Sequence, residues 1–417
     1  MASKHIVKLL DGSTHHYRLR GLNENDEDIA KWTKFCASVF SYKPNPPSPS
    51  YFARHFYNDP RHDANLVRVL TYRPDNNASS QEEEAIVSSV RIFQRTISMG
   101  PRHPPIETGG IGEVCTSPDH QRRGLSKVLL QDALKIMRDS SSRVGLEAMA
   151  CSSLHASPTF QPVYSKVGGY KSVVSQWSLV PIRLQYFFSS ESTGNQSAFM
   201  RQAQFPKDTP QLMKLHQIYS EQRFAGCIIR SETYWNDYVS AELGDTLWVM
   251  TTTSSSYHED DSKNEDSEER IVGWISIRKR GGRYQLREFG ADISADERDK
   301  ETGEAKVTLK KPVNMAFVMK ELLSKALSQA GETVEGDEGS AVSLHLPTVV
   351  WNEIKRDASI LDSCHQIYFD FDGVQVDDDD GWMYVVFDES KEQTNVFDST
   401  MRNEDPVPHL VWPTDSF

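Results

Sequence analysis

The sequence lacks any long apolar run, and it contains few cysteines. No stretch of the 417 residues reaches the roughly 18 consecutive apolar side chains that a membrane-spanning helix needs. The five cysteines are scattered, and no two of them form a C-x-x-C pair: Cys36, Cys115, Cys151, Cys227 and Cys364. Such a set is typical of a reducing compartment and argues against a zinc site. We therefore expect a cytoplasmic protein with no membrane span and no metal.

Basic residues are also in short supply. The chain has 46 lysines and arginines against 59 aspartates and glutamates, so its formal net charge is −13. This excess of negative charge disfavours nucleic-acid binding and is compatible with a cationic amine as partner. Two acidic runs, at 258–266 and 377–380, supply part of the charge, and we expect both to be solvated loops. The first residues lead into a strand-like stretch and lack the makeup of a signal peptide.

Hydrophobic patterning predicts helices and strands in two successive parts. Up to about residue 188 the expected order is helix, helix, strand, strand, strand, helix, strand, helix, strand. Strands are expected at 66–72, 85–93, 144–149 and 172–180, the last of them closing the sheet. After a polar linker at 189–195, a second part repeats helices, strands, helix, strand, helix and strand.

The most informative segment is 112–130, which predicts a buried strand, a short turn and an amphipathic helix. Val114, Cys115 and Thr116 are strand formers, and the apolar residues that begin at Leu125 recur at helical spacing. Gly124 allows the backbone to approach a ligand closely. A helix start has free N–H groups, and with two adjacent arginines it favours the binding of a pyrophosphate.

This segment resembles the signature of the GCN5-related N-acetyltransferases, the GNAT superfamily. Gln121-x-x-Gly124-x-Ser126 is similar to the family's Q/R-x-x-G-x-G/A loop, and it departs from that loop in having Ser126 at the last position. The resemblance implies acetyl-CoA as the cofactor. The residues that it implies hold this cofactor are Val114, Cys115, Thr116, Gln121, Arg122, Arg123, Gly124, Leu125, Ser126 and Lys127.

A second segment, 162–170, resembles the family's Y-x-x-x-G-F/Y pattern. The resemblance implies that Tyr164 lies beside the coenzyme A sulfur and protonates the departing thiolate. The alternative is that Tyr164 is a core aromatic residue whose hydroxyl bonds a carbonyl.

The resemblance implies an α+β to α/β fold with two GNAT-like domains, each a mixed, mostly antiparallel sheet flanked by helices. We expect a catalytic domain at 1–188, a degenerate GNAT-like domain at 198–392, and a tail at 393–417 that docks toward the active site. The second domain lacks a glycine-rich loop before its main helix, because Lys310, Lys311 and Pro312 stand there.

The layout resembles that of the fungal lysine N6-acetyltransferases, which implies direct transfer of an acetyl group to a small amine, with the N6-amine of free L-lysine as the expected acceptor. Two alternatives remain open: an N-acetyltransferase acting on proteins or peptides, and a regulatory protein that binds coenzyme A without turnover. The oligomeric state is not predicted.

The general base is the least defined residue. Glu113 lies in the cofactor strand, but we interpret it as structural. The tandem relatives imply that a C-terminal carboxylate enters the site, so the Phe417 carboxylate or Asp415 is the expected base or amine anchor, with plain packing of Trp412 and Phe417 as the alternative. The substrate contacts are expected on the two N-terminal helices, at Trp32, Phe35 and Phe56.

Overall fold

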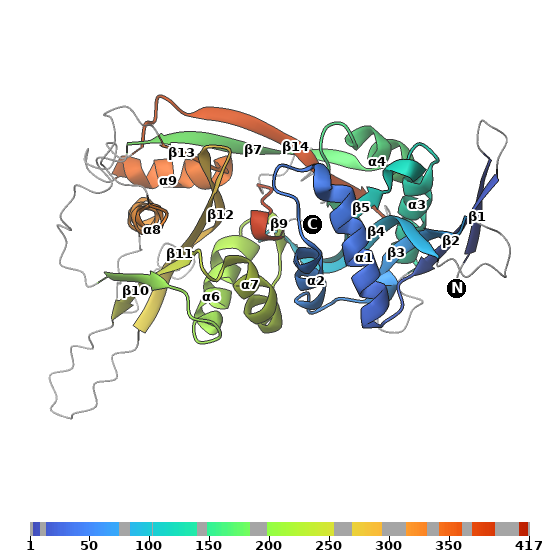
Figure 1. Ribbon diagram of the computed structural model, residues 1–417. Coiled ribbons are helices and arrows are strands. Elements are labelled where there is room, and N and C mark those ends of the chain that lie inside the picture. Colours follow the sequence, from blue (N-terminus) through green and yellow to red (C-terminus); the bar gives the residue numbers. More distant parts are fainter. Residues whose placement is uncertain are drawn as a thin grey trace.

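The computed structural model describes residues 3–8, 14–74, 84–101, 103–139, 148–183, 198–253, 269–293, 314–331, 342–360, 369–387 and 408–415. In these ranges one sheet of 14 strands runs through both parts of the chain, in the order β1-β2-β3-β4-β5-β6-β14-β7-β13-β12-β11-β10-β8, with β9 paired to β4 (Figure 1). Most neighbouring strands are antiparallel, while β5–β6 and β12–β13 are parallel. The expected mixed, mostly antiparallel fold is confirmed.

The strands are β1 (Ser3–Lys8), β2 (Thr14–Gly21), β3 (Val67–Tyr72), β4 (Ala85–Met99), β5 (Ile106–Thr116), β6 (Cys151–His155), β7 (Lys171–Ile182), β8 (Ala198–Gln202), β9 (Ala225–Ile228), β10 (Leu247–Thr253), β11 (Glu269–Arg280), β12 (Arg283–Ala291), β13 (Val342–Pro347) and β14 (Gln375–Val386). The helices are α1 (Asp26–Val39), α2 (Pro49–Tyr57), α3 (Leu125–Arg138), α4 (Gln161–Gly168), α6 (Thr209–His216), α7 (Ser240–Leu243), α8 (Met315–Gln329) and α9 (Thr348–Ile360). Short helical turns are η1 (Phe40–Tyr42), η2 (Ala64–Leu66), η3 (Pro118–His120), η5 (Gln217–Glu221), η6 (Tyr234–Val239) and η8 (Pro413–Asp415).

The helices of the first part begin where the sequence supplies caps. The side chain of Asn25 accepts from the backbone N–H of Asp28 at the start of α1, and Ser48 caps α2 just before Pro49. Helices α1 and α2 then bury residues such as Trp32 and Phe56 against one face of the sheet. Helix α3 packs on the opposite face, where Leu129 and its apolar neighbours join a separate core. The two faces of β5 are thus covered by different helices.

A third and larger core lies in the second part, at the left in Figure 1, where α6, α8 and α9 cover strands β10 to β13. Strand β14 comes from late in the chain yet lies between β6 and β7, and it is antiparallel to both. Strand β7 also pairs with β13, so it joins the two parts of the sheet. The expectation that residues 172–180 close the sheet is therefore wrong.

Two further local predictions need correction. The acidic run 377–380 is not a loop but lies inside β14, where Asp379 contacts Nε2 of His155 at 3.0 Å. A run of aspartates can therefore form part of a strand when one of them, here Asp379, pairs with a side chain on the neighbouring strand β6. The strand expected at 144–149 is found later, at Cys151–His155, and most of the expected range lies outside the described residues.

The expected helices between residues 26 and 347 fall within a few residues of their predicted bounds, whereas the strand expected at 85–93 continues to Met99 and the strand before the turn already begins at Ile106. The linker at 189–195 and the acidic run 258–266 lie outside the described residues. Within the described ranges, no helix combines the length and hydropathy needed to cross a membrane. The domain boundaries at 188, 198 and 392 stay a prediction.

Candidate active site

Strands β5 and β6 separate part of the way along their length. They pair in parallel from Thr108–Cys151 to Ile111–Leu154, but β5 continues as far as Thr116. On its other edge β5 stays paired with β4 up to Thr116. The β6-facing edge of β5 after Ile111 has no strand partner in the described ranges. Its backbone N–H and C=O groups can therefore bond a ligand that enters between the strands.

A bulge reshapes β5 at this point. Ser89 pairs with Cys115 and Arg91 with Gly112, so Glu113 and Val114 together face a single residue of β4. Glu113 adopts a left-handed backbone conformation with φ of 54°, which is strained for a residue other than glycine. Strain of this kind accumulates at functional sites because the surrounding fold must hold it in place.

The chain then turns into α3 as the sequence predicts. Gly124 has φ of 74° and precedes the first residue of α3, and no side chain caps this helix start. A Cβ atom added at Gly124 would have no atom within 4 Å, so the space above the turn is open. Uncapped N–H groups at a helix N-terminus, beside open space, fit a phosphate group.

Of the expected cofactor residues in the turn, Arg122 is exposed, while Gln121 and Arg123 form hydrogen bonds within the protein. Gln121 donates to the carbonyl of Thr116 at 3.3 Å, which fixes the loop, and Arg122 is exposed. Arg123 bonds the hydroxyl of Tyr17 at 2.8 Å and the carbonyl of Asp119 at 2.6 Å, so it ties the turn to β2.

The residues on either side of this turn are placed by the strand and by the helix. On β5, Val114 packs toward α3, while the Cys115 thiol lies 3.9 Å from that of Cys36 on α1. Thr116 bonds the Ser88 hydroxyl at 2.7 Å. The side chain of Leu125 is buried in the core beneath α3, whereas Ser126 and Lys127 lie at the surface of its first turn.

Tyr164 lies on α4 with its ring half-buried. Its ring meets Tyr170 edge-on with a centroid distance of 6.1 Å. Burial raises the pKa of Tyr164 to about 12, so the hydroxyl stays protonated at neutral pH. A neutral phenol is a proton donor, which is what the expected role requires.

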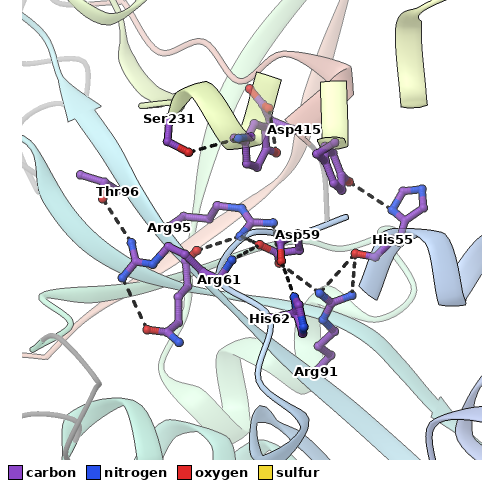
Figure 2. A network of polar contacts seen from close by, with 12 residues as sticks. His55, Asp59, Arg61, His62, Arg91, Arg95, Thr96, Ser231 and Asp415 are labelled. Atoms are coloured by element: carbon purple, nitrogen blue, oxygen red, sulfur yellow. Dashed lines mark hydrogen bonds and ion pairs between the residues drawn. The ribbon is translucent and has the colours of Figure 1, made fainter. Parts of the chain in front are cut away.

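A buried network of opposite charges underlies the α2 side of the site (Figure 2). Asp59 follows α2 and is 1% exposed, and its carboxylate pairs with Arg91 at 3.0 Å and with Arg95 at 3.0 Å. Both arginines project from β4, and the Arg95 guanidinium also lies over the Tyr234 ring. Burial by itself raises the pKa of Asp59, but the charges of Arg95 and Arg91 outweigh it and leave this pKa lowered.

Arg91 also reaches the bulge of β5. Its Nη1 lies 3.6 Å from Oε1 of Glu113. The other oxygen of Glu113, Oε2, is buried, and in the described part of the chain it has no hydrogen-bond partner. Burial raises the pKa of Glu113, and the Asp59 charge adds to this effect, while Arg91 and His55 oppose it. The result is a carboxylate at the bulge that holds a proton more readily than an ordinary glutamate.

A second carboxylate joins the two parts of the chain. Glu242 on α7 accepts from Arg54 of α2 at 2.6 Å, lies 2.9 Å from Nε2 of His55, and is 3.4 Å from Arg287 of β12. Burial raises its pKa, but the hydrogen bond and charge of His55 and the charges of Arg54 and Arg287 lower it to about 2. Glu242 is thus fully ionised at neutral pH and holds α2 against the second part.

The described end of the tail lies beside this network. Asp415 is 2% exposed and pairs through Oδ2 with Arg230 at 2.7 Å, and Arg230 also bonds Glu288. The hydroxyl of Tyr234 lies 3.2 Å from Asp415, and the Arg95 guanidinium lies over the Tyr234 ring, so Tyr234 connects the tail to Arg95. Phe417, the expected catalytic carboxylate, lies outside the described residues.

The expected substrate residues are mostly interior. Trp32 is 0% exposed and donates to the Ser89 hydroxyl, and Phe56 is 2% exposed beneath the Arg91 guanidinium. Phe35 is partly buried against the same core. The role of these three residues in substrate binding stays a prediction, and the burial of Trp32 and Phe56 gives it no support.

The charged residues of the site were missed by sequence reasoning, which had noted only Glu113 and Asp415. Asp59 lies 32 residues from Arg91 and 36 from Arg95, so no local pattern links them. Two arginines within a strand-forming stretch were the available signal, because a charged side chain in a buried strand needs a partner. In the described ranges, no three His, Cys, Asp and Glu side chains gather as metal ligands would.

Residues 19–168 match the family described as acetyltransferase (GNAT) domain. The match runs through the β5 bulge, the Gly124 turn and α4, so this part of the chain is similar to a GNAT acetyltransferase domain. Among curated proteins, no match to the chain was found.

Two solved structures are similar over most of the chain. A conserved protein of unknown function from Enterococcus faecalis V583, described as a probable N-acyltransferase, is 13% identical, with 89% of this chain and 72% of the other covered and a TM-score of 0.53. A GCN5-related N-acetyltransferase from Anabaena variabilis ATCC 29413 is 14% identical, with 89% and 73% covered and a TM-score of 0.51. At these identities the likeness establishes the fold.

Proposed function

Taking the similarity of residues 19–168 to a GNAT acetyltransferase domain as the premise, we propose that this protein transfers an acetyl group from acetyl-CoA directly to the amine of a small molecule. The observation that carries the proposal is the geometry of β5, which leaves β6 after Ile111, bulges at Glu113 and leads into the open turn at Gly124. One strand thus offers free backbone groups at the bulge and free helix N–H groups a few residues later.

In this proposal the residues from Gln121 to Lys127 hold the cofactor phosphates, with the uncapped start of α3 as the anion site. The unpaired edge of β5 at Val114 to Thr116 binds the pantetheine arm. When bound, acetyl-CoA supplies the activated acyl group. A backbone N–H at Val114 polarises the acyl carbonyl, and positioning of both substrates supplies much of the remaining rate.

Two side chains of the domain handle protons. Tyr164 donates a proton to the leaving thiolate, which its raised pKa of about 12 permits because the phenol is neutral. The attacking amine must lose a proton, and Glu113 is the carboxylate at the bulge with a raised pKa and an unbonded Oε2. We therefore revise the structural interpretation of Glu113 and propose it as a base. The role of the Phe417 carboxylate stays a competing prediction.

The expected acceptor is the N6-amine of free L-lysine, by resemblance to the fungal lysine N6-acetyltransferases, and a cytoplasmic location is part of the same proposal. Cationic acceptors are compatible with the net charge of −13. The contacts of Glu242 with Arg54 and Arg287 support a small acceptor, because they hold α2 against the second part beside the site.

The proposal is tested by thiol release from acetyl-CoA with the full chain and a panel of amines. The panel holds free lysine, other diamines and amino acids, aminoglycosides and a lysine-containing peptide. Turnover of small amines supports the proposal. Turnover of the peptide alone moves the protein to the acetyltransferases that act on proteins. Binding of coenzyme A without any turnover contradicts the proposal and supports a regulatory role.

A further inference from the structure

Three basic side chains, Lys43, Arg278 and Arg280, lie where the two parts of the chain meet. Arg278 on β11 is half-buried and donates from Nε and Nη2 to Oε1 of Gln285, at 2.9 and 2.8 Å. Arg280 lies two residues further along the strand, and Lys43 follows η1 with its ammonium over the Phe40 ring. In the ranges that the structure describes, none of these three side chains forms an ion pair. We call Lys43, Arg278 and Arg280 the cation cluster.

The members of the cation cluster repel one another. Burial and the charges of Arg287 and Arg280 lower the pKa of Arg278 to about 10, while the charges of Tyr51 and Glu242 oppose this shift. Burial and the charge of Arg280 also lower the pKa of Lys43. Arg287, by contrast, shares the Glu242 carboxylate with Arg54. The repulsion among these basic side chains is unfavourable even though the net charge of the chain is −13, and a bound anion would reduce this repulsion.

The cation cluster lies next to the proposed base. Burial raises the pKa of Tyr51, the charges of Glu242 and Glu113 raise it further, and those of Arg54 and Arg278 lower it. Tyr51 on α2 therefore lies within electrostatic range of both Glu113 and Arg278. Its ring is 39% exposed and lies 4.2 Å from the His55 ring. Contacts place this ring beside both features: the His55 carbonyl accepts from Arg91, which contacts Glu113, and the His55 ring lies 2.9 Å from Glu242, which contacts Arg287 of β12. An aliphatic chain can lie along the partly exposed Tyr51 ring.

The cluster is not placed to bind the cofactor phosphates. The cofactor phosphates are proposed to lie at the start of α3, which packs on one face of strands β3, β4 and β5. Tyr51 and Lys43 belong to the segment of η1 and α2, which covers the opposite face. The cluster consequently faces the side of β5 from which the acceptor amine must approach Glu113.

We propose that Arg278, with Arg280 and Lys43 beside it, binds an anionic group of the acceptor, so that the substrate class is an aliphatic amine carrying a carboxylate or phosphate several bonds from the reacting nitrogen. This inference rests on the proposed acetyl transfer and adds the substrate class and the residues that select it. Arg278 supplies a planar pair of donors suited to such an oxyanion. The amine then reaches the bulge at Glu113.

The kinetic test compares lysine with 1,5-diaminopentane, which has the same chain and amine but no carboxylate. The wild type is expected to prefer lysine in kcat/KM by about 10-fold to 100-fold, the range of one charge-assisted hydrogen bond. Arg278→Gln is expected to remove this preference by raising the KM for lysine toward that for the diamine. 5-Aminopentyl phosphate distinguishes the two anions, because preference for it over lysine assigns the cluster to phosphate. Equal use of lysine, aminopentyl phosphate and diamine by the wild type overturns the inference.

A binding test keeps the inference separate from the proposed function. Calorimetry on the full chain measures the affinity for 6-aminohexanoate and for 1,5-diaminopentane, whether or not either is acetylated. Binding of 6-aminohexanoate alone, weakened about tenfold or more in Arg278→Gln, supports the cluster even if no amine is turned over. Binding of the acid that Arg278→Gln does not weaken overturns it, even if acetyl transfer is confirmed.

The matched control is Lys279→Gln, which removes the same charge from the adjacent residue, on the opposite face of β11. This variant should keep the wild-type preference. Thermal unfolding distinguishes a binding role from a structural one. Arg278→Gln relieves like-charge repulsion and should not lower Tm, whereas loss of a structural residue would lower it. A lower affinity of Arg278→Gln for coenzyme A would assign the cluster to the cofactor and overturn the inference.

Discussion

Asp59 and Arg91 form an ion pair of 3.0 Å whose side chains are 1% and 2% exposed, so almost no water screens it. The same carboxylate holds Arg95 at 3.0 Å. Two guanidinium groups inside the first part thus depend on one aspartate that lies just after α2. Since Arg91 also contacts Glu113, this pair supports the residue that we propose as the base.

Asp59→Asn should destabilise the fold strongly. The change keeps the shape of the side chain but leaves Arg91 and Arg95 buried without their shared counter-charge, which costs about 3–5 kcal/mol. Urea unfolding measures the loss. Asp237→Asn, at an exposed position of η6, is the control and should change stability by less than about 0.5 kcal/mol. A similar small effect in both variants would show that the buried pair contributes little.

Acid should remove the same contribution in the wild type. The folded pKa of Asp59 lies below its ordinary value of 3.8, so its stabilisation is present above that value and is lost as pH falls through the lowered folded pKa. Unfolding of the wild type and of Asp59→Asn from about pH 7 to about pH 3 should therefore give a gap in stability that narrows once the pH falls below about 3.8. A constant gap across this range would contradict the assignment.

Gly124→Ala should weaken coenzyme A binding beyond its effect on the fold. At φ of 74° any Cβ introduces strain of about 1–2 kcal/mol, and this Cβ would point into the open space where the phosphates are proposed to lie. Gly331→Ala is matched to it, because Gly331 has φ of 81° and equally open surroundings but follows α8. Both variants should lose similar stability, while only Gly124→Ala should lose affinity. Equal affinity in both would place the phosphates elsewhere.

Sequence reasoning succeeded where the chemistry is local. The turn at Gly124 combines a strand, a glycine and an amphipathic helix within about twenty residues, so composition and spacing were enough. Tyr164 was located by the same kind of short pattern. Both residues occupy the elements that the sequence predicted for them.

Features that depend on contacts between distant segments were not predictable. The pairing of Asp59 with β4, the contacts of Glu242 with α2, and the insertion of β14 beside β6 each join segments with no shared pattern. The left-handed backbone at Glu113 is likewise imposed by the register of β4 against β5, since no glycine marks the position. These tertiary constraints explain why Glu113 was interpreted as structural from sequence.

Tyr164→Phe should lower kcat without lowering stability. The change removes only the hydroxyl, and loss of a general acid reduces turnover by about 10²-fold to 10⁴-fold. Tyr170→Phe is the matched control, because the Tyr170 hydroxyl bonds Ser152 at 2.7 Å in the core. That variant should lose about 1 kcal/mol of stability and little activity. If Tyr164→Phe turns over normally, the proton comes from another group.

Glu113→Gln should change the pH profile as well as the rate. A base must be deprotonated to act, and the pKa of Glu113 is raised above its ordinary value of 4.5, so wild-type kcat/KM should fall as pH drops through that raised pKa. The variant cannot titrate, and it should lose about 10²-fold or more in rate together with this acid limb. Glu107→Gln, on the same strand and paired with Arg61, should keep both rate and limb. If Glu113→Gln keeps both the wild-type rate and the fall of kcat/KM at low pH, another carboxylate is the base. Removal of residues 416–417 would then test whether that carboxylate belongs to the C-terminal tail.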